Sequence, residues 1–139
     1  MSEATEGLPG NISTLTEEEC WELVDAATVG RFGLVVDGTV LIIPVNYLVD
    51  VDLIIRTLPD GIIARHVGTR VTFEVDYHSH EGVGWSVLMH GDLKVLPDDE
   101  AELVGRWNRV LPWAGGARSL FMSFHPDAIS GRRVVRHRN

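Results

Sequence analysis

The segment 56–66 combines residue types that bind anions at the end of a strand. Arg56 and Thr57 close an apolar run, and a proline–aspartate–glycine turn leads into a short helix-like segment. A guanidinium, a hydroxyl and the free amides at a helix start are groups that bind phosphate. Asp60 opposes this role, because its carboxylate repels an anion and, as a predicted N-cap, occupies the same amides. The pattern indicates an anion site whose turn carries a competing charge.

A second group of polar residues has the spacing of metal ligands. His78 and His80 stand two apart, so on a strand they would share one face, with Asp76 and Glu81 close in sequence. This arrangement is compatible with a metal site, but it is more typical of a solvated loop. Cys20 falls on the apolar stripe of a predicted helix, where a buried thiol is inert. No metal ligand and no nucleophile is therefore assigned.

Tryptophans next to an arginine offer a different kind of site. Trp113 and Arg118 belong to the irregular, glycine-rich run "PWAGGAR", and Trp85 stands at the start of a strand. A tryptophan in such a loop can lie against a flat ring or a neighbouring subunit. The alternative is a lid over the core, and the residues themselves do not choose between the two.

The elements that must position these residues are one helix and a series of strands. Thr16 and Glu19 form a capping box that begins a helix with apolar residues at helical spacing, and Gly30 is predicted to end it. Asp37 and Gly38 are a strong hairpin signal between two apolar runs. Further strands are predicted at 53–57, 70–77, 84–96, 119–125 and 132–135, with a second helix at 97–110. Short antiparallel connections favour a small, mainly β barrel over a doubly wound sheet.

Bulk properties narrow the class of protein. The 139 residues suit one domain, predicted over 14–139 after a disordered lead-in of residues 1–13. A net charge of −8 argues against a broad nucleic-acid surface. No run approaches the roughly 20 apolar residues of a membrane span. The single cysteine fits a reducing compartment, and a cytoplasmic location is predicted.

Several segments occur in an order that identifies a family. They are "CWEL…VGRF", "PVNYLVD", "IIRT", "FEVD", "GWSV", "PWAGGAR" and "GRRV". Over residues 15 to 135 the series resembles the pyridoxamine 5′-phosphate oxidase-related flavin-binding split barrels. The resemblance implies a six-stranded antiparallel split β-barrel with Greek-key connections. It also implies a homodimer with FMN, or in some members a deazaflavin coenzyme, in clefts between the subunits.

The resemblance also implies which residues bind the cofactor. Those expected to edge the flavin ring are Pro44, Val45, Asn46 and Tyr47; those expected at the ribityl phosphate are Arg56 and Thr57; those expected on or near the partner side of the cleft are Trp85, Trp113 and Arg118. The cofactor carries the hydride chemistry, while the protein orients the ring and excludes water. No catalytic side chain is named, because such sites often work without a general acid or base.

Two positions depart from the family pattern, and at one of them, Asp60, relatives tend to have a small or neutral residue. Relatives usually have a lysine that meets the phosphate, and the corresponding position here is Ile62. Arg65, one turn further on, either replaces that lysine or pairs with Asp60 or solvent; His66 and Arg70 are further candidates. The resemblance therefore predicts an oxidoreductase acting on a small organic substrate. The alternative is a non-catalytic ligand-binding or regulatory protein that has lost tight FMN binding.

Overall fold

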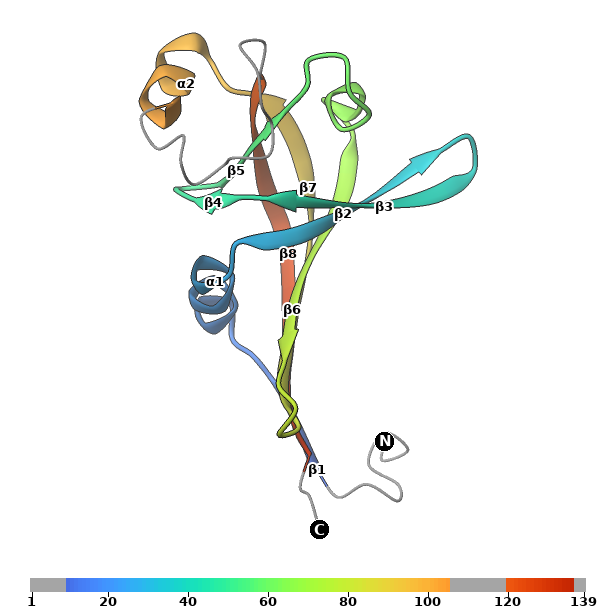
Figure 1. Cartoon of the computed structure of the whole chain (residues 1–139), viewed down its shortest axis with the longest axis vertical. Helices are drawn as coiled ribbons and strands as arrows, with labels where there is room; N and C mark the ends of the chain where they lie inside the picture. Colours follow the sequence, from blue (N-terminus) through green and yellow to red (C-terminus); the bar gives the residue numbers. More distant parts are fainter. Residues whose placement is uncertain (1–9, 106–119, 137–139) are drawn as a thin grey trace.

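The computed structural model describes residues 10–105 and 120–136, which form antiparallel strands flanked by two α-helices (Figure 1). In chain order the elements are β1 (Gly10–Thr14), α1 (Glu17–Ala26), β2 (Val29–Val36), β3 (Thr39–Asn46), β4 (Leu48–Val49), β5 (Leu53–Thr57), the 3₁₀ turn η2 (Ala64–His66), β6 (Arg70–His78), β7 (Val83–Val95), α2 (Asp98–Gly105) and β8 (Leu120–Arg136). Neither of these helices has the length and apolar character needed to cross a lipid bilayer.

The strands of the described residues form one curled, eight-stranded sheet. Its order is β3-β2-β6-β7-β8-β5-β4, and β1 pairs with β8 outside this path. Strands β3 and β5 lie far apart in that order, yet they contact one another because the sheet curls. The predicted antiparallel split barrel is confirmed. The short strands β1 and β4 add to the six that were expected.

The longest strands extend beyond the barrel as a three-stranded antiparallel ribbon. β6, β7 and β8 run side by side along the vertical axis of Figure 1, and β7 pairs with β8 from Val83 to Val95. A bulge between His90 and Gly91 bends this pair; a Cβ on Gly91 would lie 2.0 Å from the His125 carbonyl oxygen. We call residues 74–78, 83–88 and 130–136, at the end remote from β5, the stem.

Helix α1 begins as predicted and ends earlier. The Thr16 amide donates to Glu19 Oε1 at 2.8 Å, and the Glu19 amide donates to Thr16 Oγ1 at 3.1 Å, which completes the capping box. The helix ends at Ala26, so the prediction that Gly30 ends it was wrong. Gly30 lies in β2, where a Cβ would be 2.3 Å from the Phe73 ring. The absence of a side chain at Gly30 leaves room for the Phe73 ring.

The chain start also differs from expectation. Residues 10–13, predicted to belong to a disordered lead-in, pair with β8 in a regular antiparallel register from Gly10–Arg136 to Thr14–Arg132. Residues 1–9 lie outside the described part. The polar run GNIST carries no apolar alternation, so only its long-range partner makes it a strand. The Asp37–Gly38 hairpin is confirmed, with φ of 50° and 77°, the conformation of a type I′ turn.

The core lies inside the curl of the sheet. Phe32, Phe73 and Phe124 meet there with ring centroids 4.7 to 5.8 Å apart, the range of favourable aromatic pairs. Cys20 and Val24 of α1 are fully buried against the same cluster. The core therefore fixes α1, β2, β6 and β8 relative to one another, and with them the ends of β3 and β5.

Candidate functional site

Arg56 and Thr57 lie at the end of β5, where both side chains are half-buried. Arg56 is opposite Phe121 of β8 in the register, and its guanidinium carbon lies 5.7 Å from the centre of the Phe121 ring. The Nε atom of Arg56 is buried. Strand pairing and the aromatic contact thus hold a permanent positive charge at one place on the barrel.

The end of β3 lies beside this charge. Pro44 is exposed, while Val45 and Asn46 are half-buried. After a break at Tyr47, the chain returns as β4, which pairs with β5 through Leu48–Ile54 and Val49–Leu53. Asn46 itself pairs with Val29 of β2. β3 and β5 also contact one another directly, so the strands that carry the residues expected at the ring and at the phosphate are neighbours.

Tyr47 has a different role from the one expected. Its side chain is 1% exposed, and its hydroxyl donates to the Val24 carbonyl oxygen at 2.5 Å. Burial, and to a smaller degree the charge of Asp25, raises the pKa of Tyr47 well above its ordinary value. The hydroxyl bonds to α1, and the ring packs edge-on against Phe73 of β6 with centroids 5.4 Å apart. The side chain therefore lies in the core and not on the flavin side where it was expected. Tyr47 anchors the β3–β4 corner and thereby positions Asn46.

The turn after β5 is not the start of an α-helix. The Gly61 amide donates to the Leu58 carbonyl at 3.0 Å, and the following η2 is a three-residue 3₁₀ turn. Its N-cap is Ile63, with no side-chain cap, so the prediction that Asp60 caps a helix was wrong. Ile62, at the family's lysine position, packs partly buried against the core.

The residues considered as replacements for the lysine all have other partners. Arg65 is exposed, and its Nη2 donates to the backbone carbonyl of Asp60 at 3.4 Å. The Nδ1 of His66 lies 2.8 Å from the Ile62 carbonyl, to which it can only donate. Arg70 forms an ion pair with Asp127. The described residues that were expected at the phosphate and that lie at the end of β5 are Arg56 and Thr57.

Trp85 lies at the other end of the long strands. It pairs with Tyr77 and Arg133 in the stem, about 30 Å of extended β7 from the part of β8 next to Arg56. One chain therefore does not bring Trp85 to Arg56. Trp113 and Arg118 lie outside the described residues. Among the residues described, no group of three or more His, Cys, Asp or Glu side chains could hold a metal ion.

The stem contains a cluster of which the sequence analysis identified only His78, His80 and Asp76. A cavity of about 530 Å³ opens on it, and its lining includes His78, His80, Arg132 and Arg136. The two arginines stand four apart in β8, so their side chains leave the same face of the strand. That spacing is visible in the sequence, but the pairing with β6 and β7 that adds the histidines is not.

Comparison with known proteins agrees with this architecture. A family model described as pyridoxamine 5′-phosphate oxidase matches residues 16–133. A FAD-binding protein from Mycobacterium smegmatis superposes with a TM-score of 0.74 at 29% identity, covering 87% of this chain and 98% of that one. For a FAD-binding protein from Mesorhizobium loti the values are 0.71, 26%, 90% and 98%.

The fold is also shared at lower identity. A putative pyridoxamine 5′-phosphate oxidase from Corynebacterium glutamicum superposes with a TM-score of 0.76 at 22% identity, covering 92% of this chain and 96% of that one. The search of curated proteins found no match. The family match spans most of the sequence and agrees with the sheet order and the curl. The chain therefore belongs to the pyridoxamine 5′-phosphate oxidase family.

Proposed function

We propose that this protein is a flavin-dependent oxidoreductase that acts on a small organic substrate. The observation that carries the proposal is the corner at the end of β5, where Arg56 and Thr57 lie beside the Asn46 end of β3. Two relatives of similar length, at 29% and 26% identity, are described as FAD-binding. FAD and FMN share the ribityl phosphate that this corner suits, so both are candidate cofactors.

The residues present supply two of the groups that bind a flavin phosphate, a guanidinium and a hydroxyl. Arg56 supplies a fixed, permanently charged donor, and Thr57 supplies a hydroxyl. The ring would lie along Pro44, Val45 and Asn46, which are accessible on β3. A bound flavin supplies the hydride chemistry, and these residues orient it and keep water away. The missing lysine removes one charged hydrogen bond, so binding about ten- to a hundredfold weaker than in a complete site is expected.

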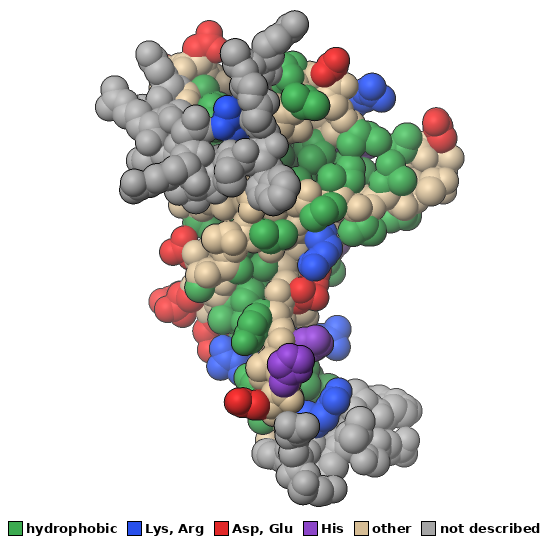
Figure 2. Space-filling view, viewed as in Figure 1, with side chains coloured by type: hydrophobic (Ala, Val, Ile, Leu, Met, Phe, Trp, Pro, Cys, Tyr) green, Lys and Arg blue, Asp and Glu red, His purple; other side chains and the backbone are tan. Residues whose placement is uncertain are grey.

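A homodimer is part of the proposal. The β2–β3 hairpin, which we call the arm, exposes 60% to 65% of the surface of Val35, Val40 and Ile42. Figure 2 shows apolar side chains gathered on this arm. Exposed apolar patches of this kind mark interaction surfaces. Light scattering should give twice the 15.4 kDa mass of the chain. A monomer at micromolar concentration would contradict this part of the proposal.

Flavin titration tests cofactor binding. Quenching of flavin fluorescence is followed for FMN, FAD and a deazaflavin coenzyme, with native protein, Arg56→Ala and Arg65→Ala. Native protein should bind a flavin saturably, and Arg56→Ala should weaken binding at least tenfold. Arg65→Ala is the matched control: its side chain bonds the Asp60 carbonyl, so affinity should change less than twofold. No saturable binding of any of the three cofactors would refute the proposal.

Redox turnover tests the oxidoreductase assignment separately. Loaded protein is reduced anaerobically and then mixed with a panel of small organic acceptors. Reoxidation of the bound flavin should be faster than that of free flavin at equal concentration for at least one acceptor. If free flavin reacts as fast with every acceptor, the protein binds flavin without directing its chemistry.

A second candidate function is ligand binding or regulation without flavin chemistry. The observation that favours it is the half-buried Ile62 at the expected lysine position, with Arg65 held by the turn. Ile62→Lys combined with Asp60→Gly should then create FMN affinity that the native protein lacks. Leu58→Lys is the control, because it adds the same charge at an exposed site in the same turn. Tight FMN binding by the native protein would eliminate this candidate.

A further inference from the structure

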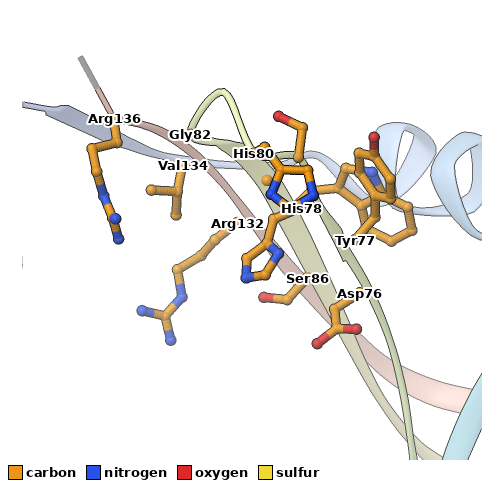
Figure 3. Close-up of a pocket in the computed structure, with 12 residues that line it drawn as sticks. Asp76, Tyr77, His78, His80, Gly82, Ser86, Arg132, Val134 and Arg136 are labelled. Carbon is orange, nitrogen blue, oxygen red and sulfur yellow. The ribbon is translucent and has the colours of Figure 1, made fainter. Parts of the chain in front are cut away.

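The stem cavity is built on the outer face of three paired strands. The register sets Asp76, Ser86 and Arg132 in one row across β6, β7 and β8. The next row is His78, Gly84 and Val134. Neighbours in a row project from the same face of the sheet. Figure 3 shows His78, Ser86 and Arg132 on one side of the ribbon, with Arg136 further along β8.

Glycines make room in this face. Gly84 is buried at its centre, where a Cβ would lie 2.6 Å from the His78 Cβ. Gly82 has a φ of +85°, and a Cβ there would lie 2.8 Å from the Arg136 carbonyl oxygen. The Arg136 amide donates to the Gly82 carbonyl at 2.7 Å, which ties the hairpin turn to β8. The floor is therefore backbone, and longer side chains form the walls.

The charge of the cavity is opposite to that of the chain. Arg132 and Arg136 are permanent cations, and His78 and His80 add imidazole groups. The one carboxylate in the lining, Asp76, accepts from Arg31 at 3.3 Å, and Arg31 also pairs with Glu74 at 3.1 Å. The two arginines of the lining outnumber this single carboxylate. Figure 2 shows the histidines beside basic side chains on the lower part of the molecule. In a chain of net charge −8, this is a local site for anions.

We propose that the stem carries a second binding site, which takes the phosphate group of a small molecule. Arginine binds phosphate oxygens through two parallel hydrogen bonds, and imidazole and the Ser86 hydroxyl can complete the shell. A metal ion does not suit the cavity, because the two guanidinium groups repel a cation. A volume of about 530 Å³ lies within the range of small-molecule sites. The site lies at the opposite end of β8 from Arg56 of the same chain. Its lining also contains Trp85, which is expected on the partner side of the flavin cleft, so a titration of flavin-saturated protein tests whether the two sites are separate.

Histidine ring resonances measure this binding directly. Native protein is titrated with inorganic phosphate or phenyl phosphate at constant ionic strength set by chloride. The ring signals of His78 and His80 should shift saturably. Those of His90 and His125, which do not line the cavity, should keep their chemical shifts. Tighter binding of phenyl phosphate assigns an organic ester as the ligand, and equal binding assigns free phosphate. Shifts that never saturate with either probe would overturn the proposal.

Matched variants distinguish phosphate binding in the cavity from non-specific attraction by surface charge. Arg132→Ala and Arg136→Ala should each weaken binding about ten- to a hundredfold, the effect of one charged hydrogen bond. Arg133→Ala should have no effect, because Arg133 lies on the other face of β8, near Glu19 of α1. An equal loss in Arg133→Ala would show non-specific attraction and overturn the site.

Two further titrations test whether the phosphate site of the stem is separate from the flavin site. Arg56→Ala should bind phosphate at the stem as the native protein does, whatever its flavin affinity. Native protein saturated with flavin should give the same phosphate titration. If flavin saturation abolishes the shifts of His78 and His80, the cavity belongs to the flavin site and the second site is refuted.

Discussion

The substitution Tyr47→Phe removes one buried hydroxyl from the corner that positions Asn46. The ring keeps its core contacts, but the 2.5 Å hydrogen bond to the Val24 carbonyl is lost. That carbonyl still accepts from the Ala27 amide at 3.2 Å. The loss should therefore be about 1 kcal/mol, as for one ordinary hydrogen bond, rather than the roughly 3 kcal/mol of an unsatisfied buried group. For a domain of this size, the melting temperature should fall by about 4 °C.

The same hydroxyl predicts a pH dependence of the free energy of unfolding. Burial raises the pKa of Tyr47, so the unfolded chain loses this proton from about pH 10 while the folded chain retains it. The contribution of Tyr47 is thus complete below about pH 10 and is lost as the pH rises further. Native protein should lose stability more steeply above pH 10 than Tyr47→Phe does.

Circular-dichroism melts between pH 7 and pH 11.5 measure both effects. Tyr77→Phe is the control, because its side chain is 58% exposed and the melting temperature should hardly change. If Tyr47→Phe is as stable as Tyr77→Phe at pH 7, the hydroxyl is not bonded inside the fold. Parallel pH curves for native protein and Tyr47→Phe would refute the burial of this group.

Other expected outcomes follow from single contacts. Gly131→Ala should cost about 1–3 kcal/mol in chemical unfolding, because its Cβ would lie 2.7 Å from Cys20 Sγ; an unchanged midpoint would contradict the packing of α1 on β8. Burial raises the pKa of the Cys20 thiol, so a thiol reagent should label it only on unfolding, and rapid labelling of native protein would contradict this. Arg70 lowers the pKa of Asp127; this stabilisation should disappear as the pH falls through that lowered pKa, and melts of Asp127→Asn should lack this part of the acid dependence.

Local signals in the sequence predicted those elements that depend on near neighbours. The capping box at Thr16 and the Asp37–Gly38 turn involve residues at most three apart, and β5 has the bounds that were predicted. The glycine at position 30 was misread, because a glycine after a helix usually ends it. Its actual constraint is the ring of Phe73, 43 residues away. No local pattern contains that contact.

In the candidate site too, local patterns predicted some residues, whereas long-range contacts decide the roles of others. Arg56 and Thr57 were identified because they close an apolar strand before a turn. The role of Tyr47 could not be predicted, because it depends on the packing of α1. For Arg65 the sequence left two roles open, and in the structure its side chain bonds the Asp60 carbonyl, which agrees with the second of them. The stem cluster needs the β7–β8 register, which joins residues more than 40 positions apart, such as Ser86 and Arg132.

The central claim is that Arg56 and Thr57 hold a flavin phosphate, and a crystal structure grown with saturating FMN or FAD tests it most directly. The account predicts phosphate oxygens within about 2.7–3.2 Å of the Arg56 guanidinium and the Thr57 hydroxyl, with the ring along Pro44 to Asn46. A flavin bound with its phosphates away from Arg56, or a β5 corner that stays empty at saturating flavin, would contradict it.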